Sequence, residues 1–330
     1  MRSFLPTVDL RRFNANLTGV LILLFISFSL HAITVTDSLR TFSTAFTSQR
    51  LLCDACGCSA SGGSMGFSTV GENSFLGVRS MYQRYESNDR LYTNSPWRLE
   101  QFRTYQIWTR FRISTKLELT AQVPWQHHNR ETATGVQTRT GLGDVSINAL
   151  YKLFSSENEA KTKSHRFHGG LGIKLPTGEF DQANSNTVNP AFQLGTGSFD
   201  FTILGEYVFE YQKSGVNVMA SYLIKTENER RYRFGNQTNL AAIAYRKVTI
   251  SHWQMLPQMG VAAEFFESNY SRRSRVDDTS GRVVFARAGF DVSRKWINAG
   301  FSAMLPVAQY LNNGKVRAHE RLSVHLNLIL

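Results

Sequence analysis

The sequence predicts an all-β fold, a transmembrane antiparallel up-and-down β-barrel of about 12 strands. Three observations favour this fold. Apolar and polar residues alternate along segments of roughly ten residues, the pattern of barrel strands with one lipid-facing side. Short and long connections between these segments alternate along the chain. The composition is 42% hydrophobic with a mean hydropathy of −0.26, too polar for a bundle of membrane helices.

Residues 1–32 have the order of charge and apolarity that is typical of a secretory signal peptide. Three arginines give a basic start, Leu17–Leu30 is almost wholly apolar, and Ala32 supplies a small residue before the cut. The apolar run is shorter than the roughly 20 residues that a spanning helix needs. We therefore expect cleavage rather than an uncleaved anchor, and export of the mature chain.

Residues 33–72 are predicted to form a periplasmic or plug segment. It contains the chain's three cysteines, Cys53, Cys56 and Cys58, within six positions. Three thiolates at this spacing could bind a soft ion such as Cu(I) or Zn(II). A disulfide from Cys53 to Cys56 or Cys58, with one spare thiol, is the alternative in an oxidising compartment. Lipidation at Cys53 is a third reading, which the bulky Leu52 before it disfavours.

Residues 73–330 are predicted to form the barrel. In the clearest strand, the odd positions of Tyr105–Ile113 are mainly apolar, and the even positions carry Gln106, Trp108, Arg110 and Arg112. An even number of strands leaves both termini in the periplasm of a protein of the cell outer membrane. The predicted strands are 75–85, 105–113, 117–123, 145–153, 167–175, 199–209, 216–224, 236–246, 256–266, 282–292, 297–305 and 322–330.

The connections predict which end of the barrel faces outwards. Tight turns at 114–116, 212–215 and 293–295 alternate with long polar segments, which we expect to be external loops. The long segments are 86–96, 128–140, 176–197, 226–233, 267–281 and 308–319. His127 and His128, at the start of one such segment, are predicted to be solvated loop residues. Aromatic residues near the strand ends suit interfacial girdles, whereas the strands of a soluble β-sandwich would be shorter and more charged.

Alternation also predicts a charged lumen. Seven charged residues should point inwards: Arg110, Arg112, Glu118, Asp144, Asp200, Glu206 and Glu210. In a channel such groups select solutes by charge. The alternative is that they pair across a narrow bore and hold the barrel shut.

Several short motifs occur in a fixed order along the predicted barrel. They are Val123-Pro124-Trp125, Gly141-Leu142-Gly143-Asp144, Leu175-Pro176-Thr177-Gly178, and the octapeptide QLGTGSFD at 193–200. With them, residues 70–330 resemble the outer-membrane "transporter" proteins grouped as the meta-pathway phenol-degradation family. The cysteine segment is similar to N-terminal segments of Bacteroidetes-type members. The resemblance implies transport of small, often aromatic molecules, and it carries no catalytic residues. The residues themselves are explained by strand-end geometry, since glycine suits sharp bends.

The predicted function is therefore a barrel transporter or porin-like channel for a small-molecule solute, linked through the cysteines to Cu or Zn handling. The alternative is a non-transporting barrel that binds partners in an envelope complex. An outer-membrane lipase using Ser323 and His325 is less favoured, so we expect no enzyme activity. The formal charge of +12 is scattered, with no basic helix, which disfavours nucleic acid. Expected partners are outer-membrane lipid, lipopolysaccharide and the barrel assembly machinery.

Overall fold

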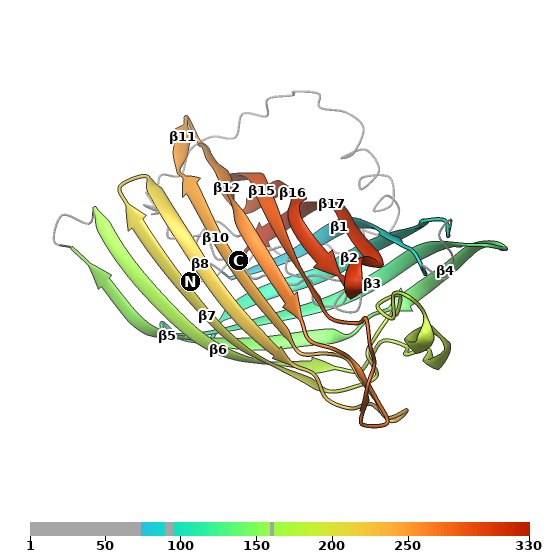
Figure 1. Cartoon of the computed structure of the whole chain (residues 1–330). Helices are drawn as coiled ribbons and strands as arrows, with labels where there is room; N and C mark the ends of the chain where they lie inside the picture. The colour runs from blue at the N-terminus through green and yellow to red at the C-terminus, as the bar shows by residue number, and fades with distance from the viewer. Residues whose placement is uncertain (1–73, 90–94, 159–161) are drawn as a thin grey trace, which may run out of the picture. The chain divides into compact units, whose positions relative to one another are not determined.

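The computed structural model describes residues 74–89, 95–158 and 162–330 (Figure 1). Helical structure in this part of the chain consists of two short 3-10 helices, η3 (Gln182–Asn186) and η4 (Asn312–Gly314). No helix among these residues is long and apolar enough to cross a membrane. Signal cleavage within 1–32 and the cysteine segment 33–72 lie outside the described residues.

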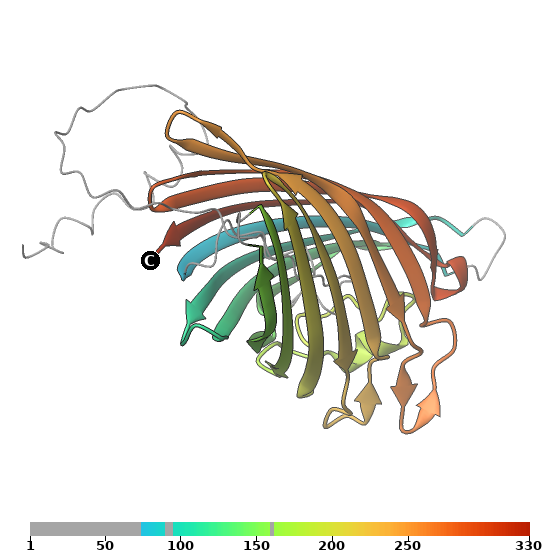
Figure 2. The ribbon, with the colours of Figure 1, turned by 90° about the vertical axis from the view of Figure 1, so that its left-hand side faces the viewer.

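Twelve antiparallel strands form a closed barrel, which confirms the predicted fold (Figures 1 and 2). Each consecutive pair of these strands is hydrogen-bonded, including β10 with β12, and the pairing of the first strand, β1, with the last, β17, closes the ring. The strands are β1 (Phe75–Ser87), β2 (Arg98–Arg112), β3 (Leu117–Thr132), β5 (Val145–Glu157), β6 (Lys163–Leu175), β7 (Asp200–Tyr211), β8 (Ser214–Ile224), β10 (Gln237–Arg246), β12 (Trp253–Phe266), β15 (Gly281–Arg294), β16 (Ile297–Leu311) and β17 (Val316–Ile329).

The two ends of the barrel differ. Short connections such as 212–213 and 295–296 lie at the end where β1 begins and β17 ends, and we call it the turn end. The opposite end, the loop end, carries the longer connections. These include a small sheet of β9 (Tyr232–Arg233), β13 (Tyr270–Ser271) and β14 (Ser274–Arg275).

The two faces of the wall are inverted relative to a soluble protein. Each of the twelve strands presents at least one large apolar side chain outwards, for example Val78, Ile107 and Leu322. The inward positions of the same strands are mostly polar or charged, as with Arg79, Gln106 and Arg321. An apolar exterior is stable in lipid and would be unfavourable in water. The alternation in the sequence thus specifies a lipid-facing surface and excludes a soluble sandwich.

The predicted loop 128–140 is wrong, because this segment is a β-hairpin. Strand β3 continues to Thr132 and turns directly into β4 (Gly135–Leu142), which pairs with it. His128 therefore keeps the inward direction of the even positions and is fully buried, whereas its neighbour His127 faces the other side. The prediction of solvated histidines fails for His128 because polar residues on both faces of a strand give no periodic signal.

The connection between β6 and β7, residues 176–199, folds into the barrel and is called the inward loop below. All eight residues from 189 to 196 are buried. Asn312, the first residue of η4, donates from Nδ2 to the Val188 carbonyl oxygen at 3.0 Å. Six strand positions around the ring separate β6 and β7 from β16 and β17, so this contact shows that the loop crosses the loop-end opening. The expectation of an external loop at 176–197 is therefore wrong.

Candidate functional site

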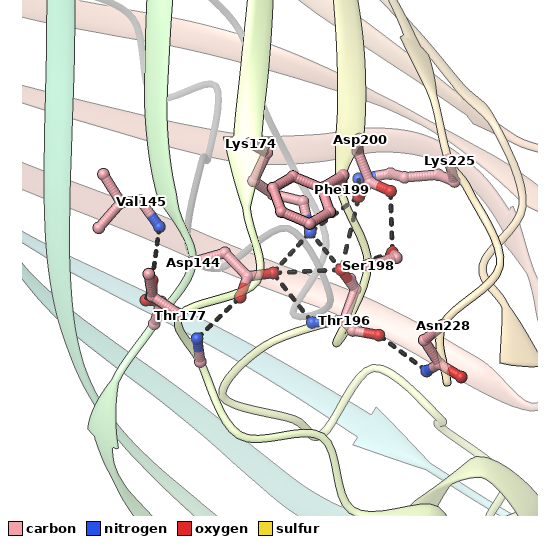
Figure 3. Close-up of polar contacts among 12 residues, drawn as sticks. Asp144, Val145, Lys174, Thr177, Thr196, Ser198, Phe199, Asp200, Lys225 and Asn228 are labelled. Atoms are coloured by element: carbon pink, nitrogen blue, oxygen red, sulfur yellow. Dashed lines mark hydrogen bonds and ion pairs between the residues drawn. The ribbon is translucent and has the colours of Figure 1, made fainter. Parts of the chain in front are cut away.

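Asp144 anchors the base of the inward loop and brings three sequence motifs together (Figure 3). One carboxylate oxygen accepts from the Gly178 amide at 2.9 Å, and the other accepts from the Thr196 amide at 2.9 Å. Lys174 lies 2.5 Å from the second oxygen. The carboxylate of one motif thus binds the backbone of the other two, and this holds the two ends of the loop together.

Glycine is required where those two loop ends meet. A Cβ atom on Gly178 would lie 2.6 Å from the Leu194 carbonyl oxygen and 2.8 Å from the Gly195 Cα. Both neighbours are backbone, which cannot move aside as a flexible side chain can. Gly178 and Gly195 therefore allow two chain segments to pack closely, instead of forming the sharp bend expected from the sequence.

Asp200 forms the second half of the same network. It lies 2.8 Å from Lys174 Nζ and 3.5 Å from Lys225 Nζ, and it accepts from Ser198 Oγ at 2.9 Å. The Thr226 amide, from the next loop-end connection, donates to it at 3.0 Å. Lys174 therefore joins two buried carboxylates, and the network links the inward loop to its neighbour (Figure 3).

Further along the loop, Arg130 on β3 holds the tip. Its guanidinium donates to Asn184 Oδ1 at 2.7 Å and lies 4.4 Å from the ring centroid of Phe192. Glu100 on β2 accepts from Asn189 Nδ2 and from Ser87 Oγ. No sequence pattern predicts a role for these residues, because contacts between distant positions leave no periodic trace. The loop tip is thus bound by charged side chains of the wall and by an aromatic contact.

Phe192 completes an apolar cluster inside the loop half of the barrel, which we call the upper constriction. The ring is fully buried and packs edge-on against Phe102 at 5.9 Å between centroids, with His128 on the same side at 6.3 Å. The other members come from both walls of the barrel, namely Met81, Tyr85, Ala241, Ala262, Val283, Phe285, Met304, Leu311, Val316 and Ala318. In channels, apolar constrictions of this kind oppose the passage of water and ions by dewetting.

A second apolar cluster lies within the barrel and is called the lower constriction. It consists of Phe75, Trp108, Met219 and Ile243, all buried. Strands β1 and β2, which carry the two aromatic residues, stand six positions around the ring from β8 and β10, which carry the two aliphatic ones. The cluster therefore bridges the bore from opposite walls without any contribution from the inward loop.

The charged residues predicted for the lumen are mostly inside. Arg112 differs, since it is exposed at the last position of β2 although it shares the parity of Arg110. The buried residues are Arg110, Glu118, Asp144, Asp200, Glu206 and Glu210. Among the described residues, buried cations and buried acids are equal in number. The cations are Arg79, Arg110, Arg130, Arg166, Lys174, Lys225, Arg287 and Arg321; the acids are Glu100, Glu118, Asp144, Asp200, Glu206, Glu210, Glu264 and Asp291.

Many of these buried cations and acids form ion pairs with one another. Arg321 lies 2.8 Å from Glu264, with both side chains fully buried. Glu210 receives Arg166 at 3.0 Å and Lys247 at 2.6 Å. Such pairs neutralise the interior and leave little net charge to select an ion by its sign. The arrangement supports the alternative in which the charges pair across the bore and hold the barrel shut.

Ser323 and His325 lie inside the barrel on β17 and are both buried. His325 Nε2 is 3.2 Å from Asn298 Oδ1 and 3.5 Å from Asp291 Oδ1. A lipase would need these groups at the lipid-facing surface, where an ester can reach the serine. Their position inside the wall gives a membrane lipid no direct access.

The predicted metal ligands Cys53, Cys56 and Cys58 lie outside the described residues. Within the described part of the chain, no three His, Cys, Asp or Glu side chains are grouped so that they could hold a metal ion.

Residues 81–309 match the family model described as "Putative MetA-pathway of phenol degradation". The chain belongs to this family. The match covers most of the barrel, including Asp144, Asp200 and the whole inward loop. No curated protein sequence matches the chain.

Several solved outer-membrane proteins are similar to this chain, and one of them has a TM-score above 0.5. The COG4313 outer membrane channel from Pseudomonas putida F1 is 14% identical, with a TM-score of 0.59 over 79% of this chain and 97% of that one. The beta domain of the Bordetella autotransporter Brka is 11% identical, with a TM-score of 0.48 over 78% and 100%. A Pseudomonas aeruginosa FadL homologue is 12% identical, with a TM-score of 0.35 over 86% and 99%. At 14% identity the likeness to the channel concerns the fold alone.

Proposed function

We propose that this protein is an outer-membrane channel or transporter for small molecules that the inward loop keeps closed. One observation carries the proposal. The loop half of the bore is filled by a loop, with Phe192 at its centre, rather than by wall side chains alone. A docked loop can leave without breaking a barrel strand, so the block is removable. Membership of a phenol-degradation family and the fold shared with a protein named as a channel support this function.

We propose that the turn end faces the periplasm and the loop end the outside. Short periplasmic turns and longer outer loops are the general arrangement of bacterial barrels. In this orientation a solute from outside meets the inward loop first and the lower constriction second.

Tethering the loop tests the proposal. Val188→Cys and Asn312→Cys are introduced together in a Cys53/Cys56/Cys58→Ser background, because the two sites meet across the loop-end opening. Single-channel currents are recorded in planar bilayers before and after bridging with a short bis-maleimide. We expect openings before bridging and their loss afterwards, whereas each single-cysteine control keeps its openings.

Two results would contradict the proposal. Currents that persist after complete bridging would show that the loop is not the gate. Absence of current in every variant, including one lacking residues 33–70, would favour the non-transporting, partner-binding barrel.

We also propose that the barrel is not a lipase. A phospholipase assay on the folded protein and its Ser323→Ala variant checks this. Hydrolysis that depends on Ser323 would overturn it. Handling of Cu or Zn through the cysteine segment is a finer proposal that needs its own metal measurement, described in the Discussion.

A further inference from the structure

The lipid-facing wall carries a groove near the turn end, across β7, β8, β10 and β12. Its volume is about 490 Å³, within the roughly 300–1,000 Å³ range of small-molecule sites. The lining is mainly apolar and includes Phe209, Val216, Ala244, Arg246, Pro257 and Met259. Met259, on one side, is 70% exposed. The groove is thus an apolar hollow in the lipid-facing wall.

The sequence accounts for the hollow. The pairing of β10 with β12 runs as far as Tyr245 opposite Gln258. The next residue of β12 is Pro257, which has no N–H to donate to the ladder. Pairing resumes at Val248, in β11 (Val248–Ile250), opposite Met255. The small Ala244 beside this interruption leaves the space unfilled.

Positive charge lies at the edge of the groove. Arg246 lines it and is exposed. The Lys247 amide donates to the Lys213 carbonyl oxygen at 2.6 Å. The exposed Lys213, in the turn between β7 and β8, therefore lies near Arg246 at the end of β10. An exposed Arg294 lies over the ring of Trp253 at 5.0 Å, at the same end of the adjacent strands. Cations beside an apolar hollow at this depth suit a lipid with an anionic headgroup.

We propose that the groove binds an anionic phospholipid of the leaflet at the turn end. One acyl chain occupies the hollow between Phe209, Ala244 and Met259, and the phosphate lies beside Arg246 and Lys213. The site lies on the outer wall and does not depend on the inward loop or on transport. It can be present even if the protein conducts nothing.

Lipid retention measures the binding. The full chain is purified into micelles that contain equal amounts of phosphatidylglycerol and phosphatidylethanolamine, and bound lipid is counted by native mass spectrometry. Wild type should retain phosphatidylglycerol preferentially. Ala244→Phe fills the hollow and should abolish retention, while Ala220→Phe, outward on β8 but outside the groove, should not. Arg246→Gln should lower the preference for phosphatidylglycerol about fivefold, the effect of one cation beside anionic lipid.

A control variant, a folding check and a cross-linking measurement accompany this test. Lys116→Gln, in the β2–β3 turn on the opposite side of the ring, should leave the preference unchanged. Migration of unheated samples on gels reports folding of every variant. Phosphatidylglycerol with a photoreactive acyl chain should cross-link to β7, β8, β10 or β12. Cross-links spread around the barrel, equal retention in Ala244→Phe, or preferential retention of lipopolysaccharide would each overturn the proposal.

Discussion

The guanidinium of Arg130 lies 4.4 Å from the ring centroid of Phe192, so one charged side chain of the wall holds the apolar tip of the inward loop. The same guanidinium also binds Asn184, on η3. Contact with a cation orients the ring, and burial of the ring excludes water from the guanidinium. In the proposed channel, closure of the upper constriction and docking of the loop are therefore the same event.

Phe192→Ala should open the upper constriction. Truncating a buried phenylalanine costs about 3 kcal/mol or more, which shifts the balance between docked and undocked loop roughly a hundredfold. More frequent openings in planar bilayers would show this. Phe199→Ala is the matched control, because Phe199 ends the same loop but is 53% exposed. Equal opening frequencies in the two variants would contradict the role of Phe192.

The two constrictions should act as barriers in series. Trp108→Ala alone should change the current little, since the upper constriction stays closed. Combined with Phe192→Ala, it should raise the conductance above that of either single variant. A large increase from Trp108→Ala alone would mean that the upper constriction is not a barrier.

Asp144→Asn should release the base of the loop. The substitution leaves Lys174 with Asp200 as its remaining close carboxylate partner and weakens the acceptor for Gly178 and Thr196. Removing one partner of a buried charged pair costs about 3–5 kcal/mol. Faster proteolytic cleavage within 176–199 should report the release. The double variant Asp144→Asn/Lys174→Met should increase the rate of cleavage by less than the two single variants predict together. Increases that simply add in free energy would argue against coupling of the two residues.

Arg321→Met should destabilise the barrel itself. It leaves Glu264 as a buried carboxylate without its arginine, at a cost of about 3–5 kcal/mol. A lower urea midpoint in unfolding from micelles checks this. Replacing both residues, Arg321→Met with Glu264→Gln, should recover most of the loss. A double variant as unstable as the single one would show that the pair itself is not the cause.

The cysteine segment is predicted to bind Cu or Zn. Elemental analysis of purified wild type should find a stoichiometric metal that is lost in the Cys53/Cys56/Cys58→Ser variant. A metal-free wild type with one reactive thiol would instead support the disulfide.

The strands of the wall and the inward direction of most of their charged residues were predictable from sequence, but the inward loop was not. Each of the twelve barrel strands overlaps a predicted strand, because a wall with lipid on one side and polar groups on the other imposes a period of two. The inward loop follows no period, so nothing local distinguishes 189–196 from an external loop. Asp144 was expected inside, but its bonds to Gly178 and Thr196 join positions 34 and 52 residues away. Contacts at such separations depend on the completed barrel.

Closure of the ring by β1 and β17 also sets the order of assembly. Phe75 lies opposite Ile329, so this seam joins the two ends of the described barrel. The entropy of bringing distant segments together makes such a seam a late step. Without β17, β1 and β16 are open edges that can pair with other chains. A chain that stops before Val316 is therefore expected to aggregate or be degraded rather than to form a smaller barrel.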